Sequence, residues 1–267
     1  MKILFIGDVA ARSGRDALAQ YLPTVKAECE PDVIIVNGEN AAHGIGINDK
    51  ICKEFFDLGV DVITLGNHSW DQREVIPYIE REKKLIRPLN YPAGTPGNGW
   101  VVHTLPNGQK ILVINAMGQL FMDPLDNPFN AIDVLLKTYK LNEKVNAIFV
   151  DFHAEATSEK MALAHYLDGR VSAVVGTHTH IPTADAQIFP QGTAFQSDAG
   201  MTGDYNSVIG MKKDTPIMRF SRKISFERLS PAEGDGTMCG TLIETDNNTG
   251  LAKSIRPIRR GPRLQNA

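Results

Sequence analysis

The chain has 267 residues, of which 42% are hydrophobic and 22% charged, and its formal net charge is −3. This composition is typical of a globular protein and excludes the disordered, fibrous and low-complexity classes. The charge also argues against a dedicated nucleic-acid or membrane-surface binder, which would need a basic surface. We therefore expect a single soluble domain over residues 1–267, of the size of a typical enzyme.

The cysteines and the N-terminus indicate a cytoplasmic protein. Cys29, Cys52 and Cys239 form no Cys-x-x-Cys pair, so neither a disulfide framework nor a thiolate zinc site is expected. The apolar run at residues 3–6 is too short for the core of a signal peptide. The sequence contains no run of about 18 consecutive apolar residues, which is the length that a membrane-spanning helix needs.

Short apolar runs rich in β-branched residues alternate with segments that carry helix signals. Such runs are typical of strands buried on both faces of a central sheet. The strands expected in this way are residues 3–6, 33–36, 62–65, 111–114, 147–150 and 171–175. Helices are expected from after Ser13 to about residue 28, at 49–58 after Asn48, at 129–140 after Asn127-Pro128, and at 158–167 after Thr157.

The remaining segments complete an α/β pattern. Asn107-Gly108 predicts a hairpin between residues 100–105 and 110–114. Further short strands are expected at residues 193–196, 223–229 and 241–244, with a turn at 247–250. With no linker or repeat, the simplest architecture is two packed sheets with helices on the outer faces. The basic tail at about residues 257–267 is interpreted, together with the basic residues before it from Lys253 on, as a solvated terminus.

Polar side chains of an unusual kind follow five of the expected strands. In chain order these are Asp8, Glu39 with Asn40, Asn67 with His68, His153, and His178 with His180. Taken singly, each has an ordinary structural interpretation, such as a turn or a helix cap. Because ligands bind beyond the carboxyl ends of strands in α/β sheets, the five positions together predict one site.

The residue types suit a metal centre. Asp, Glu, Asn and His without Cys are ligands for Mn, Fe, Zn or Ni rather than for soft copper. Two ions about 3.5–4 Å apart would need a bridging carboxylate, for which Glu39 is the natural candidate. Such a pair generates hydroxide near neutral pH and clamps phosphoryl oxygens, and His68 would suit protonation of the leaving oxygen.

The order of these motifs resembles that of the calcineurin-like metallophosphoesterase superfamily, whose motifs are D-x-H, G-D-x-x-D, G-N-H-[DE], a lone H and G-H-x-H. The departures are specific: no histidine follows Asp8, Glu39 replaces the bridging Asp, Ser69 replaces an acid, and Thr177 separates Gly176 from the next histidine. They coincide with the YmdB-like bacterial phosphoesterases. The segments that look like the motifs of this subgroup are residues 6–9, 37–42, 66–70, 151–160 and 176–180. The resemblance runs from residue 1 to about residue 256.

The resemblance implies a fold, a metal centre and an activity. The fold would be two packed mixed sheets flanked by helices, an αββα sandwich, and the site would hold two ions, iron or manganese. By carry-over, one ion would be held by Asp8, Glu39, Asn40 and His180, and the other by Glu39, Asn67, His153 and His178, with Glu39 bridging and His68 as proton donor. The implied activity is hydrolysis of 2′,3′-cyclic nucleotides to 3′-nucleotides by in-line attack of a metal-activated hydroxide.

Two other functions stay open. The same metal pair would serve a phosphomonoesterase, because the superfamily motifs do not fix the type of ester. A regulatory protein that senses a cyclic nucleotide or an RNA end with slow turnover is the alternative outside enzymes. A small phosphodiester is the expected partner, RNA is only weakly indicated, no membrane contact is expected, and exposed apolar strands late in the chain favour a homo-oligomer.

Overall fold

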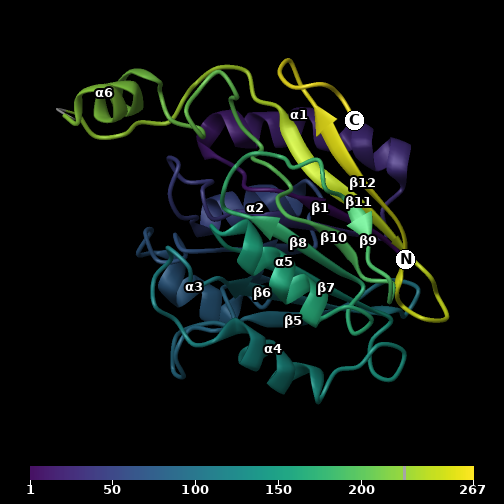
Figure 1. The fold of residues 1–267 in the computed structure, drawn as a ribbon. Coiled ribbons are helices and arrows are strands. Elements are labelled where there is room, and N and C mark those ends of the chain that lie inside the picture. The colour runs from purple at the N-terminus through teal and green to yellow at the C-terminus, as the bar shows by residue number, and fades with distance from the viewer. Residues whose placement is uncertain (225–226) are drawn as a thin grey trace.

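Two mixed sheets pack against each other in the computed structural model, which describes residues 1–224 and 227–267 (Figure 1). In the first sheet the strand order is β12-β11-β1-β2-β3-β4, and in the second it is β5-β6-β7-β8-β10-β9. The first sheet consists of β1 (Lys2–Ile6), β2 (Val33–Asn37), β3 (Val62–Thr64), β4 (Leu85–Ile86), β11 (Met238–Thr245) and β12 (Ala252–Arg260). The second consists of β5 (Trp100–Thr104), β6 (Lys110–Met117), β7 (Ala147–His153), β8 (Ala173–Thr177), β9 (Gln187–Ile188) and β10 (Ala194–Gln196).

Helices cover the outer faces of both sheets, so the expected α/β sandwich with helices outside two packed mixed sheets is confirmed. The helices are α1 (Ala11–Cys29), α2 (Asp49–Asp57), α3 (Val75–Arg81), α4 (Pro128–Leu136), α5 (Thr157–Tyr166) and α6 (Asp214–Arg222). The first three pack on the first sheet, α4 and α5 pack on the second, and α6 projects away from the sheets (Figure 1). Within the described part of the chain, no helix combines the length and the apolar character needed to cross a membrane.

Both faces of the central strands are buried, which explains their continuously apolar sequences. In β1, Ile3 and Phe5 belong to the core between the sheets, whereas Leu4 and Ile6 face the helices. The rings of Phe5 and Phe149 meet between the two sheets, with their centroids 4.9 Å apart. Alternate residues of one strand therefore fill different cores, because side chains on a strand point to opposite faces in turn.

Several predicted ends of elements are confirmed by the local geometry. The side chain of Asn48 accepts a hydrogen bond from the backbone of Ile51 at the start of α2, and Asn127 caps α4 in the same way. The hairpin between β5 and β6 forms with Gly108 in the left-handed region, at φ 83°. The turn expected at residues 247–250 joins β11 to β12.

Other helix and strand boundaries predicted from the sequence were wrong. Helix α1 begins at Ala11, so Ser13 lies inside it, and α4 ends at Leu136. The strand expected at residues 223–229 is absent from the described part of that range: Lys223 closes α6 in a left-handed conformation, and residues 225–226 lie outside the described residues.

The basic tail also needs correction, because residues 252–260 form β12 at the edge of the first sheet. Arg260 forms an ion pair with Glu28 of α1 at 2.8 Å, and Arg256 contacts the sulfur of Cys29 at 3.1 Å. These side chains cover the end of α1, so this part of the tail is structural rather than solvated. Positive charge on an edge strand also discourages pairing with another chain.

Candidate metal centre

The five polar strand ends meet at one edge of the two packed sheets. Asp8, Glu39 with Asn40, and Asn67 follow β1, β2 and β3 of the first sheet, while His153 ends β7 and His178 and His180 follow β8 of the second. All of these side chains are buried apart from Asn67 and His178, which are half-buried. Parallel pairing of the strands brings their carboxyl ends to the same edge.

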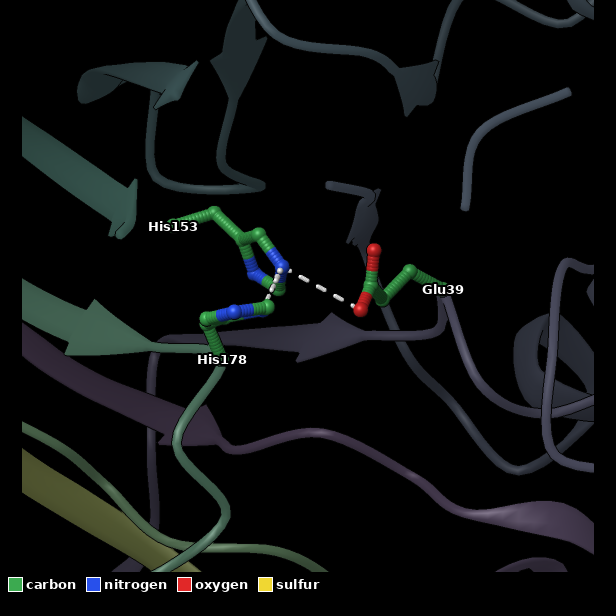
Figure 2. Close-up of side chains that lie close together, drawn as sticks. All are labelled: Glu39, His153 and His178. Carbon is green, nitrogen blue, oxygen red and sulfur yellow. Dashed lines mark hydrogen bonds and ion pairs between the residues drawn. The ribbon is translucent and has the colours of Figure 1, made fainter. Parts of the chain in front are cut away.

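Glu39, His153 and His178 form the centre of this cluster (Figure 2). The Nε2 atom of His153 lies 3.2 Å from Glu39 Oε1 and 3.1 Å from Nδ1 of His178. It also lies 2.8 Å from Oδ1 of Asn67. One ligand atom from each of Glu39, His153 and His178 lies within 4.8 Å of the others, a spacing that suits one metal ion.

A second group of predicted ligands adjoins the first through Glu39. The side-chain nitrogen Nδ2 of Asn40 lies 3.0 Å from Glu39 Oε1 and 3.1 Å from Nε2 of His180. Asp8 Oδ2 accepts a hydrogen bond from the backbone of His178 at 3.2 Å. Glu39 thus lies between the two predicted ligand sets, which is the position that a bridging carboxylate requires.

Each histidine of the predicted ligand set has a partner on its outward ring nitrogen. Nδ1 of His180 contacts the carbonyl oxygen of Ile209 at 2.9 Å, and Nε2 of His178 contacts the carboxylate of Glu155 at 3.2 Å. Because both partners are acceptors, these ring nitrogens donate, and the other nitrogen of each ring is free to carry a lone pair.

His153 is oriented by a longer relay. Its Nδ1 lies 2.9 Å from the hydroxyl of Thr177, and that hydroxyl donates to the buried carboxylate of Asp151 at 2.7 Å. Since Thr177 gives its own hydrogen to Asp151, its oxygen accepts from His153. Nδ1 therefore keeps its hydrogen, and Nε2, which faces Glu39, is the nitrogen that would bind a metal ion in place of its proton, as in a carboxylate-supported metal ligand.

The residues present fit a bound cation. Oδ1 of Asp8 is a buried acceptor with no hydrogen-bond partner among the described residues. Leaving such an atom unsatisfied costs about 1–3 kcal/mol, which a bound cation would offset. Space is reserved as well, because a Cβ atom at Gly66 would lie 2.4 Å from both Glu39 Oε2 and His153 Cδ2.

The pKa shifts in the cluster favour the ligand forms of Glu39 and His178 and place a proton on His153, the position where a cation would bind. Burial opposes ionisation of Glu39, yet the neighbouring His153 lowers the pKa of that carboxyl to about 2. Burial and the charge of His153 lower the pKa of His178 to about 3, which keeps this imidazole neutral. Burial would lower the pKa of His153, but Glu39 and Asp8 raise it to about 9, so the cluster attracts a positive charge.

His68 lies beside the ligand cluster, and its side chain has a partner, Asp71, that was not predicted from the sequence. Its backbone amide donates to Glu39 Oε2 at 3.0 Å, and its Nδ1 lies 2.7 Å from Asp71 Oδ2. The side chain is 34% exposed, so a substrate can reach it. The hydroxyl of Ser69, which stands where the superfamily has an acid, is buried against the carbonyl of Gly66 at 2.6 Å.

Asp198 supports the loop that carries two predicted ligands. His178 and His180 have left-handed backbones, with φ of 95° and 67°, and Asp198 Oδ2 accepts from both the amide and the hydroxyl of Thr179 between them. Lys160 neutralises Asp198 at 2.9 Å. Asp198 and Lys160 lie 38 residues apart in the chain, and neither was predicted as part of the site.

Comparison with known proteins agrees with this geometry. The profile of the YmdB-like protein family matches residues 4–258. The chain belongs to the YmdB-like family. The recognition made from the motifs is therefore confirmed, and the named relatives described next make the chain an enzyme of the hydrolase class.

Individual relatives of this YmdB-like protein cover nearly its whole length. The 2′,3′-cyclic-nucleotide 2′-phosphodiesterase of Bacillus subtilis is 47% identical over 97% of this chain and 96% of its own. A solved structure of a hypothetical protein from Thermus thermophilus is 44% identical, with a TM-score of 0.90 over 98% of this chain and 99% of the other. A novel phosphatase from Mycoplasma pneumoniae is 33% identical, with a TM-score of 0.91 over 98% and 93%.

Proposed function

We propose that this YmdB-like protein is a dinuclear-metal phosphodiesterase that opens 2′,3′-cyclic nucleotides to 3′-nucleotides. The observation that carries the proposal is the position of Glu39 between two groups of ligand side chains, one reaching Asn67, His153 and His178 and the other reaching Asn40 and His180. The name of the Bacillus subtilis relative, which is 47% identical over 258 aligned residues, supports the choice of substrate.

The metal ions would be held by seven side chains. Asp8, Glu39, Asn40 and His180 would bind one ion, and Glu39, Asn67, His153 and His178 the other. Iron and manganese suit this mixture of carboxylate, amide and imidazole ligands. When bound, such a pair supplies a hydroxide near neutral pH and neutralises charge on the phosphoryl oxygens.

His68 would donate a proton to the departing ribose oxygen. The leaving group of a 2′,3′-cyclic ester is an alkoxide, which leaves poorly unless it is protonated. Asp71 accepts from Nδ1 of His68, so Nε2 is the nitrogen that faces the substrate. The hydrogen bond from the backbone amide of His68 to Glu39 holds this residue next to the predicted metal ligands.

Product analysis of the purified protein tests the proposal. The protein, loaded with Mn²⁺ or with Fe²⁺ under anaerobic conditions, should convert 2′,3′-cyclic AMP to 3′-AMP. It should hydrolyse p-nitrophenyl phosphate, a simple monoester, much more slowly. Faster turnover of the monoester would favour the phosphomonoesterase, and tight binding of the cyclic nucleotide without any product would favour the sensor.

A further inference from the structure

Among the residues that the structure describes, Phe121 is the most exposed of the large apolar side chains, and it follows a strand that ends at the same sheet edge as the predicted metal ligands. The side chain of Phe121 is 90% exposed. It follows β6, whose last residue pairs with His153 across the sheet, and the backbone of Gly118 donates to the carbonyl of His153 at 3.0 Å. Phe121 is three residues further along the chain, so its Cα lies within about 11 Å of that of Gly118.

The segment that presents Phe121 is held in place on both sides. The carboxylate of Glu159, at the start of α5, accepts from the backbone amides of Gln119 at 2.8 Å and Leu120 at 3.2 Å. The side chain of Gln119 donates to the carbonyl of Leu125 at 2.9 Å and closes the loop on itself. The ring of Phe121 therefore projects from a fixed backbone, which lowers the entropic cost of binding a ligand to it.

Packing does not explain this arrangement. The backbone of Phe121 has φ 62°, a left-handed conformation that is unfavourable for a residue with a bulky side chain. Its ring gains almost no burial in return. Strained conformations of this kind cluster at ligand sites, where the surrounding structure maintains them.

We propose that Phe121 is the nucleobase subsite of this enzyme, on which the base of the cyclic nucleotide stacks while its phosphate lies at the metal centre. The proposal rests on the function proposed above and names the part of the substrate that the metal centre does not contact. Every base has a π-face, so stacking on Phe121 predicts turnover of all four 2′,3′-cyclic nucleotides with similar KM values.

The test compares two substrates with the same reacting ring. 2′,3′-Cyclic AMP carries a base, and glycerol 1,2-cyclic phosphate has the same five-membered phosphodiester without one. Phe121→Ala should raise KM for 2′,3′-cyclic AMP about 5- to 150-fold, the range expected for one lost stacking contact. It should leave kcat/KM for the glycerol ester unchanged, and Phe121→Trp should restore KM for the nucleotide.

Phe220 provides a matched control. It is a phenylalanine with a 74% exposed side chain on α6, the helix that projects away from the sheets (Figure 1). Phe220→Ala removes the same ring from the same kind of exposed surface. It should leave the kinetics of both substrates at wild-type values.

Three results would overturn the subsite. Equal losses on both substrates in Phe121→Ala would show that the side chain acts through the structure of the metal centre. Unchanged KM values combined with a changed elution volume in size-exclusion chromatography would assign Phe121 to a contact between copies of the chain. Unchanged KM and elution would exclude any contact of Phe121 with the base. A wild-type protein inactive on both esters would instead overturn the proposed function, and the subsite with it.

Discussion

The two sheets bring different chemistry to the same edge of the molecule. The predicted ligands from the first sheet are carboxylates and amides (Asp8, Glu39, Asn40 and Asn67), whereas those from the second are imidazoles (His153, His178 and His180). Neither set alone completes either predicted metal site. The centre therefore depends on the packing of the sheets through their shared core, where Phe5 meets Phe149.

The two sets also differ in what orients them. Each imidazole of the second sheet has an outer partner, namely Thr177, Glu155 or the carbonyl of Ile209. In the first sheet, Glu39 is oriented chiefly by groups of the site itself, and Oδ1 of Asp8 has no hydrogen-bond partner among the described residues. The imidazoles are therefore positioned by the fold, whereas the carboxylates provide the negative charge that would attract a cation.

The largest effect is expected from Glu39→Gln, which removes the charge at the junction of the two sets. Both ions should be lost together, and turnover of 2′,3′-cyclic AMP should fall to background. Elemental analysis of the purified variant checks this expectation. Asp71→Asn, in which a carboxylate beside the cluster becomes an amide, is the matched control and should retain wild-type metal content.

His68→Ala separates proton donation from metal binding. Turnover should fall about 10²- to 10⁴-fold, the usual contribution of a general acid, while bound metal stays at the wild-type level. The loss should be far smaller for a phosphodiester with a p-nitrophenolate leaving group, which needs no proton. Equal losses on both substrates would contradict the role assigned to His68.

A smaller effect is expected from the outer partners of the imidazole set. Thr177→Val removes the hydroxyl that accepts from His153 and donates to Asp151. Metal affinity should fall about 10- to 100-fold, as is usual for such partners. Thr177→Ser keeps the hydroxyl and should retain wild-type affinity in a competition titration with a chelator; a weakened Ser variant would show that the methyl group matters instead.

The smallest effect is expected far from the site, at the edge of the first sheet. Arg260→Ala removes the partly exposed ion pair with Glu28. Its cost in the free energy of unfolding should be at most about 1 kcal/mol, with metal content and turnover unchanged. Chemical denaturation and activity assays check this, and a loss of metal would show that β12 is coupled to the centre.

The sequence predicts the central strands and the ligand-bearing positions because both depend on local patterns. A strand buried on both faces has a continuous apolar run, as at β2, and the polar residue that follows marks its carboxyl end. The sequence also shows directly that Glu39 stands where the superfamily motif has its bridging Asp. The order of the strands is not, because it depends on contacts between distant segments.

The supporting residues could not be predicted for the same reason. Lys160 and Asp198 are 38 residues apart, and each alone has the features of an ordinary surface residue until the fold buries both. Asp71 is close to His68 in the sequence, but only the turn geometry shows that their side chains meet. Helix α6 escaped prediction because its apolar residues pack against little of the protein: Phe220 is 74% exposed.

The most direct test of the dinuclear centre is the number of metal ions per chain in protein purified anaerobically with Fe²⁺ or Mn²⁺, measured together with the product formed from 2′,3′-cyclic AMP. We predict two ions per chain in the wild-type protein, 3′-AMP as the product, and loss of both ions in Glu39→Gln. A fully active protein with a single ion, or a Glu39→Gln variant that keeps both ions and full turnover, would contradict a bridged metal pair.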